Sequence, residues 1–340
     1  MLLQGAGYVY FESFHVKAIG SMGYPVGLFI PHDDLDYLYT PNYRGHFMGG
    51  PYHDIEVAIN KHGFRDDEFA EKGSRYRMLV LGDSVVFGSG MKKENRFTEQ
   101  LENSAWAKVN RIEVLNLGVS SYTFSHYLKL AQLHFFDLQP ALVIVGFTLN
   151  DIAAMDEAWP ARRYGRYREK SKNSKPDWVR RVQHTLDRTY AGRFTGEVKS
   201  YWKALTMGAE EHYHTKWMRS VNRRWRKLED KQRLFGEIDA FDALLKRQKI
   251  PYMFLVFPEA NDLRAPTEFD YPRQEITKFL KMRHILYCDG YNEFSRYTGD
   301  LQELFLRDDS VHFTTKGHQL VSEIIQYCFE ENVQELHVSK

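Results

Sequence analysis

The chain has 340 residues, 43% of them hydrophobic, and a formal net charge of +1 at pH 7. It is long enough to bury a substantial core, as one large domain with insertions or as two small ones, and its charge balance argues against a nucleic-acid binder that is basic throughout. The two cysteines, Cys288 and Cys328, exclude a disulfide framework but leave the redox compartment open.

The N-terminal residues bear on the cellular compartment. Residues 1–7 lack the basic region and sustained apolar core of a signal peptide, and no stretch approaches 18 apolar residues. As it stands, the sequence is therefore expected to encode a soluble, cytoplasmic protein. An extracytoplasmic chain from which an anchor had been removed would look the same.

Residues 1–75 are rich in Tyr, Phe, Gly, His and Pro and contain repeated breaks, such as Tyr24-Pro25, Ile30-Pro31 and Gly49-Gly50-Pro51. Short alternating apolar runs lie between these breaks. The pattern predicts an N-terminal extension of strands and loops that packs on the main domain.

From Tyr76 onward, apolar strands alternate with amphipathic helices. The predicted strands are residues 78–81, 113–117, 141–147 and 252–257. Apolar side chains recur every three or four residues in three predicted helices, marked by Phe97, Leu101 and Ala105, by Leu234, Ile238, Phe241 and Leu245, and by Val321, Ile324, Ile325 and Cys328. This alternation is typical of βαβ units and predicts an α/β domain over residues 76–335 with a mostly parallel sheet.

The alternation stops at about residues 152–231, a stretch longer than an ordinary crossover connection. This segment carries 20 Lys and Arg against 10 Asp and Glu, and five of the six tryptophans: Trp159, Trp178, Trp202, Trp217 and Trp225. We predict a helical insertion with two interpretations. It could contact a membrane surface or an anionic polymer, or it could be a helical subdomain with a small tryptophan core and charges in water. Either could form a lid.

Two short blocks at opposite ends of the domain offer a serine, a histidine and a carboxylate. Ser84 follows the apolar run 78–81 in Gly82-Asp83-Ser84, which is typical of a strand that enters a turn. Asp309 stands three residues before His312. A serine nucleophile needs a base within hydrogen-bond reach and a third group that orients the base. Taken alone, the first block could be a helix N-cap and the second a solvated turn.

Two further blocks lie at predicted strand ends, where open α/β sheets place ligands. Gly118, in Asn116-Leu117-Gly118-Val119-Ser120, would let a backbone N–H approach a ligand without interference from a Cβ atom. Asn150 could offer its side-chain N–H to a developing oxyanion. The plain alternatives are a turn glycine and a helix cap formed with Asp151.

In this order and at these positions, the blocks resemble those of the SGNH (GDSL-like) hydrolase family, in its bacterial esterase and acyltransferase branch. Ser84, Gly118, Asn150 and His312 match the four residues of the family name, and Asp309 matches its acid. The resemblance implies a three-layer α/β/α, flavodoxin-like fold with a mostly parallel central sheet.

The resemblance extends to two longer motifs. Residues 59–66 contain an Asn-x-x-Gly-Phe-Arg segment that precedes the serine strand in this branch, and residues 309–318 match its Asp-x-x-His-x-x-x-x-Gly-His ending. Residues 59–151 and 250–330 are covered, whereas the first 50 residues and the basic insertion are not. Thr148 stands where many relatives have a glycine, which puts the local turn in question.

The resemblance implies a serine ester hydrolase that acts on small-molecule or carbohydrate esters through an acyl-enzyme. His312 would take the proton of Ser84, and Asp309 would fix the imidazole. The oxyanion would be held by the Ser84 N–H, the Gly118 N–H and the Asn150 side chain.

Two alternatives stay open. The same residues could transfer an acyl group to or from a carbohydrate, or the chain could be a non-catalytic binding module for anionic lipid or glycan. Despite His212-Tyr213-His214, the sequence has no Cys-x-x-Cys or His-Glu-x-x-His pattern and no P-loop ending. We therefore expect no metal and no cofactor.

Overall fold

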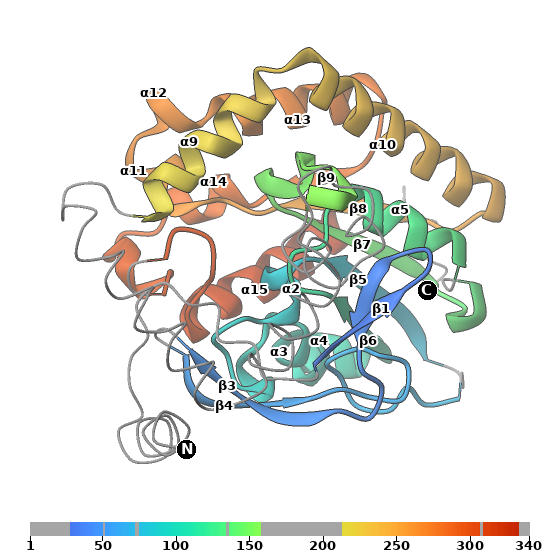
Figure 1. Cartoon of the computed structure of the whole chain (residues 1–340). Helices are drawn as coiled ribbons and strands as arrows, with labels where there is room; N and C mark the ends of the chain where they lie inside the picture. The colour runs from blue at the N-terminus through green and yellow to red at the C-terminus, as the bar shows by residue number, and fades with distance from the viewer. Residues whose placement is uncertain are drawn as a thin grey trace, which may run out of the picture.

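The computed structural model describes residues 28–49, 52–71, 75–133, 136–157, 213–306 and 309–332. Its centre is a five-stranded parallel sheet in the order β6-β5-β7-β8-β9 (Figure 1). The strands are β5 (Tyr76–Gly82), β6 (Ile112–Gly118), β7 (Leu142–Phe147), β8 (Tyr252–Val256) and β9 (Tyr287–Asp289). In chain order this is the 2-1-3-4-5 arrangement of flavodoxin-like folds. The predicted fold class is confirmed.

Helices cover both faces of the sheet, because successive side chains of each buried strand point to opposite faces. In β5, Leu79 and Leu81 face one core, and Met78 and Val80 face the other. The first core is covered by α5 (Phe124–Leu133), α9 (Tyr213–Trp225), α10 (Leu228–Gln248) and α13 (Tyr271–Met282), and the second by α3 (Phe97–Asn103), α4 (Ala105–Val109), α14 (Gly290–Ser295) and α15 (Thr315–Asn332). None of the described helices combines the length and apolar character that a membrane span requires.

The predicted strands and helices are all observed, one helix is interrupted, and the structure adds elements that were not predicted, such as α5, α13 and β9. The four predicted strands are β5 to β8, each with ends within two residues of the prediction. The edge strand β9 was not predicted, since three residues are too few to show a period. The helix marked by Phe97, Leu101 and Ala105 is interrupted at Ser104, whose backbone is extended and whose hydroxyl accepts the Ala107 N–H to cap α4. One predicted helix is therefore two short ones.

The described part of the N-terminal extension forms two antiparallel hairpins outside the central sheet. They are β1 (Phe29–His32) with β2 (Asp36–Tyr39), and β3 (Arg44–Gly49) with β4 (Tyr52–Ala58). Leu28, Tyr37 and Tyr39 are completely buried in the core that also contains α5. The first hairpin therefore shares the core of the sheet domain.

Only part of the predicted insertion, residues 152–157 and 213–231, lies among the described residues; Trp159, Trp178 and Trp202, and with them the predicted lid, lie outside. Trp225 is completely buried and its indole Nε1–H donates to the Leu149 carbonyl at 2.7 Å. This tryptophan therefore packs in the main core, and not in a small core of the insertion as one interpretation expected.

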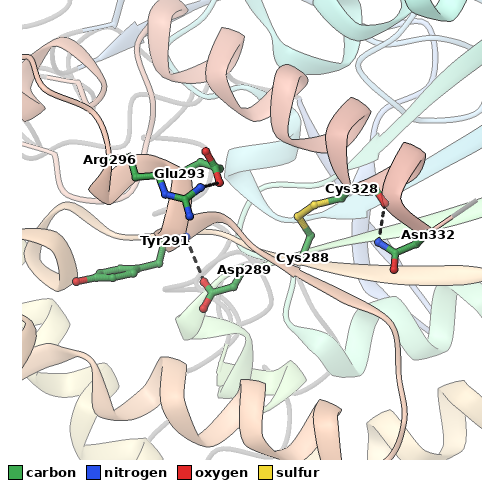
Figure 2. The surroundings of a disulfide bond; sticks show 7 residues. All are labelled: Cys288, Asp289, Tyr291, Glu293, Arg296, Cys328 and Asn332. Atoms are coloured by element: carbon green, nitrogen blue, oxygen red, sulfur yellow. Dashed lines mark hydrogen bonds and ion pairs between the residues drawn. A yellow bond between two sulfur atoms is a disulfide. The ribbon is translucent and has the colours of Figure 1, made fainter.

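The two cysteines form a single disulfide bond. Cys288 lies in β9 and Cys328 in α15, with their Cα atoms 6.2 Å apart (Figure 2). The bond ties the edge strand of the sheet to the C-terminal helix. This one cross-link joins two elements that already pack on each other, so the fold depends chiefly on its apolar core.

Candidate active site

Ser84 stands at the carboxyl end of β5, between β6 and β7, which is the switch point where open α/β sheets bind ligands. It opens the short helix α2 (Ser84–Phe87). Asp83 caps this helix by accepting the Val85 N–H at 2.9 Å. At the other end, Gly88 adopts the left-handed conformation, with φ of 76°, and closes the turn. The serine is thus presented from a helix fixed at both ends.

His312 and Asp309 lie on the loop that precedes α15, and they meet Ser84 across 228 residues of sequence. The His312 Nε2 atom is 2.8 Å from the Ser84 Oγ atom, and Nδ1 is 2.7 Å from the Asp309 Oδ2 atom. The second carboxylate oxygen accepts the N–H groups of Val311 and His312. Three predicted residues therefore form one continuous hydrogen-bonded chain, and the backbone fixes the carboxylate at its end.

The surroundings of His312 make its imidazole a stronger base than an ordinary histidine. Burial lowers the pKa of the imidazole, but the charge and hydrogen bond of Asp309, together with the charge of Asp83, outweigh burial and raise the pKa above its ordinary value. The His312 side chain keeps 19% of its surface exposed. A partly exposed imidazole beside a carboxylate can accept a proton from a hydroxyl at hydrogen-bond distance.

Asn150 lies in the 3-10 helix η3 (Leu149–Ile152), directly after β7. Its Nδ2 atom is 3.3 Å from the Asp83 Oδ2 atom, which also accepts the Thr148 hydroxyl at 3.0 Å. Burial raises the pKa of Asp83, and the hydrogen bonds that it accepts lower it in part. Asp83 therefore caps α2 through the Val85 N–H and also orients the Asn150 side chain.

The absence of a glycine at position 148 is accommodated. Thr148 has an extended backbone, with φ of −105°, which any residue adopts. Its N–H donates to the Asp151 Oδ2 atom at 3.0 Å, and its hydroxyl lies within hydrogen-bond distance of Asp83 and Asp151. The turn that precedes Asn150 is therefore built from side-chain contacts of a threonine.

Three glycines aligned across the sheet let α2 lie directly on the strands. Gly82 is the register partner of both Gly118 and Gly146. A Cβ atom at Gly82 or Gly146 would meet the Val86 side chain at 2.1 or 2.6 Å, and one at Gly118 would meet the Phe87 backbone nitrogen at 2.2 Å. Close approach of the helix therefore requires glycine at all three strand ends.

The structure does not place Gly118 in its predicted role. Gly118 is the last residue of β6, and its N–H donates to the Asn116 Oδ1 atom at 2.9 Å. A donor already paired within its own strand is not available to a bound oxyanion. The glycine is explained by the packing of α2, which a sequence block at a strand end cannot distinguish from an oxyanion site.

The loop after β6 contains a different candidate donor, the N–H group of Ser121. The Val119 N–H donates to the Gly82 carbonyl at 3.0 Å, and the Ser120 N–H donates to the Tyr39 Oη atom at 2.8 Å. Ser121 follows with φ of 64°, a region that residues with a side chain rarely adopt. Sequence reasoning missed this position, because a serine gives no sign of a left-handed backbone.

One protein-family profile matches most of the chain. The profile of the GDSL-like Lipase/Acylhydrolase family matches residues 80–320, which contain Ser84, Asn150, Asp309 and His312. The chain belongs to the GDSL-like lipase/acylhydrolase family. The description of the family as lipases and acylhydrolases identifies the class of chemistry as hydrolysis of esters.

Solved structures similar to this family member share little sequence with it. A catalytic mutant of an acetylxylan esterase from Geobacillus stearothermophilus has 13% identity and a TM-score of 0.42, with 76% of this chain and 96% of that chain covered. The psychrotrophic esterase EstA from Pseudoalteromonas sp. has 11% identity and a TM-score of 0.43, with 76% and 99% covered. An alpha/beta hydrolase enzyme from the metagenome of Lake Arreo has 14% identity and a TM-score of 0.44, with 75% and 95% covered. The search of curated proteins finds no match.

The Asn-x-x-Gly-Phe-Arg motif lies outside the matched residues of this GDSL-like hydrolase, yet it contacts the serine helix. The buried guanidinium of Arg65 donates to the carbonyls of Phe87, Gly88 and Met91, which end α2 and form the following loop. The motif therefore braces the segment that carries Ser84. Among the described residues, no three His, Cys, Asp or Glu side chains are grouped so as to hold a metal ion.

Proposed function

We propose that this chain is a serine ester hydrolase that works through an acyl-enzyme. The observation that carries the proposal is the chain of hydrogen bonds from the Ser84 Oγ atom through His312 to Asp309, at 2.8 and 2.7 Å. As Oγ attacks the ester carbonyl, His312 takes its proton and Asp309 stabilises the imidazolium. His312 returns the proton to the departing alcohol. Water, deprotonated by His312, then attacks the acyl carbonyl; the bond to the Ser84 Oγ atom breaks, His312 returns the proton to Oγ, and the acid is released.

The oxyanion is held in this proposal by the Ser84 N–H, the Asn150 side chain and the Ser121 N–H. The Asn150 Nδ2 atom carries two protons, and only one is directed at Asp83. Gly82 and Gly118 are register partners at the ends of β5 and β6, and Ser84 and Ser120 each follow two residues later in the chain. This register supports the Ser121 N–H as a donor. Within the described parts of the chain, the Ser121 N–H has no acceptor.

The nature of the acyl acceptor follows from product analysis. We propose water as the acceptor and a small-molecule or carbohydrate ester as the substrate. Adding a polysaccharide to the reaction distinguishes the transferase alternative, because an acylated sugar forms only when a sugar hydroxyl attacks the acyl-enzyme in place of water.

The test is Ser84→Ala, assayed with p-nitrophenyl acetate. Removing the nucleophile should lower turnover by about 10⁴- to 10⁶-fold, while the unfolding midpoint stays at the wild-type value. A fluorophosphonate should label the wild-type protein at Ser84 and leave the variant unlabelled. Turnover that survives in the variant contradicts the proposal, and an unlabelled, folded wild-type protein would favour the binding module.

A further inference from the structure

The first N-terminal hairpin makes two hydrogen bonds to one residue beside the serine. Tyr37 and Tyr39 lie in β2 and are completely buried. The Tyr37 hydroxyl donates to the Ser120 carbonyl at 3.0 Å, and the Tyr39 hydroxyl accepts the Ser120 N–H at 2.8 Å. Both backbone groups of Ser120 are therefore held by side chains more than 80 residues earlier in the chain, outside the segment that the family profile matches.

The Tyr37 contact determines the direction of the neighbouring N–H. The Ser120 carbonyl and the Ser121 N–H belong to the same planar peptide unit and point in opposite directions. Fixing the carbonyl therefore fixes the N–H. Ser121 keeps a left-handed backbone that a serine does not favour, and a rotation of the peptide that relaxed it would break the hydrogen bond to Tyr37.

The same hairpin also contacts the serine helix. The Tyr39 ring packs on Phe87, the last residue of α2, with centroids 5.2 Å apart. Tyr37 packs edge-on against Tyr122, which follows Ser121 in the loop after β6, also at 5.2 Å. The two tyrosines thus connect the element that carries Ser84 to the loop after β6, and this sets the distance between nucleophile and loop.

We propose that Tyr37 and Tyr39 are positioning residues, through which the N-terminal hairpin orients the Ser120–Ser121 peptide as an oxyanion donor. The inference rests on the proposed function of Ser84. It gives the extension a part in the reaction: neither tyrosine touches the substrate, and each acts through the backbone of Ser120.

The experiment compares Tyr37→Phe with Tyr122→Phe. Both changes remove one hydroxyl from the same buried cluster, but the Tyr122 hydroxyl donates to the Tyr37 carbonyl and does not touch Ser120. Tyr37→Phe should lower kcat for p-nitrophenyl acetate by about 10-fold, a fraction of the effect of losing a donor outright, with KM within about twofold. Tyr122→Phe should keep kcat within about twofold, although both variants lower the unfolding midpoint.

A second readout separates positioning from stability. A trifluoromethyl ketone, which forms a tetrahedral adduct, should bind Tyr37→Phe about 10-fold more weakly than Tyr122→Phe. Tyr39→Phe, which removes the acceptor of the Ser120 N–H, should behave like Tyr37→Phe and replaces it if that variant does not fold. If the wild-type enzyme is active and the Tyr37 and Tyr122 variants have equal kcat and equal inhibitor affinity, the inference is overturned and the proposed function is not. A wild-type protein with no ester turnover and no serine labelling would overturn the proposed function, and the inference with it.

Discussion

The loops after β6 and β7 flank Ser84, and they are held by different chemistry. The β7 loop is held from within the sheet domain by buried carboxylates: Asp83 accepts the Asn150 and Thr148 side chains, and Asp151 accepts the Thr148 N–H. The β6 loop is held by neutral tyrosine hydroxyls from the N-terminal hairpin. The position of the β7 loop should therefore respond to pH, and the position of the β6 loop should respond to changes in the hairpin.

The largest effect is expected on the β7 side. Asn150→Ala removes a side-chain donor outright, and losing one oxyanion donor costs about 10²- to 10³-fold in kcat. Steady-state kinetics with p-nitrophenyl acetate measures this. Asn103→Ala is the control, because in the described part of the chain its side chain makes a single, solvent-exposed hydrogen bond, to the Glu99 carbonyl. A loss of less than about fivefold at Asn150 would mean that the β6 loop supplies most of the stabilisation.

The next effect concerns the corrected role of Gly118. Gly118→Ala places a Cβ atom 2.2 Å from the Phe87 backbone nitrogen, where no flexible side chain can yield. We expect the free energy of unfolding, measured with urea, to fall by about 1–3 kcal/mol or more. Gly236→Ala is the matched control, since a Cβ atom there meets nothing within 4 Å in α10, and it should stabilise by about 0.5–1 kcal/mol. Unchanged stability with lower kcat in Gly118→Ala would restore Gly118 as a catalytic donor.

The sequence predicted the parts of the site that follow from strand order. Ser84 and Asn150 each come directly after an apolar run, and parallel strands bring their carboxyl ends to one edge. His312 and Asp309 were predicted as a pair because His312 is the third residue after Asp309 in one loop. Their meeting with Ser84 followed from the family resemblance, since no local pattern encodes a contact across 228 residues.

The parts that were not predicted depend on tertiary contacts with no periodic signal. Tyr37 and Tyr39 alternate with other residues in a short hairpin, and nothing in that pattern identifies Ser120 as their partner. Trp225 lies in a basic segment yet fills the main core. At Gly118 the sequence indicated correctly that a glycine is needed, but the reason given was wrong. The glycine is needed for the packing of α2, and it was interpreted as part of a binding site.

The smallest effect tests the pH dependence of the β7 side. Glu259 precedes α11 (Ala260–Arg264), is 1% exposed, and lies near the β7 loop, where burial and the charges of Asp262, Asp83 and Asp309 raise its pKa well above the ordinary value of 4.5. Above that ordinary value the folded chain holds a proton that the unfolded chain has released. The free energy of unfolding therefore falls as the pH rises toward the raised pKa.

Glu259→Gln removes this loss, because glutamine does not ionise. Near the ordinary pKa of 4.5, the variant should unfold at about the wild-type temperature. At pH 8 it should unfold at a higher temperature than the wild type, by about 2–4 °C for each kcal/mol of unfolding free energy that the substitution restores. Thermal unfolding at several pH values measures the gap. Tyr122→Phe, which removes a neutral hydroxyl on the β6 side, should show a gap that does not change with pH. A gap of constant size in Glu259→Gln would mean that Glu259 acts by packing alone and gives the β7 side no pH dependence.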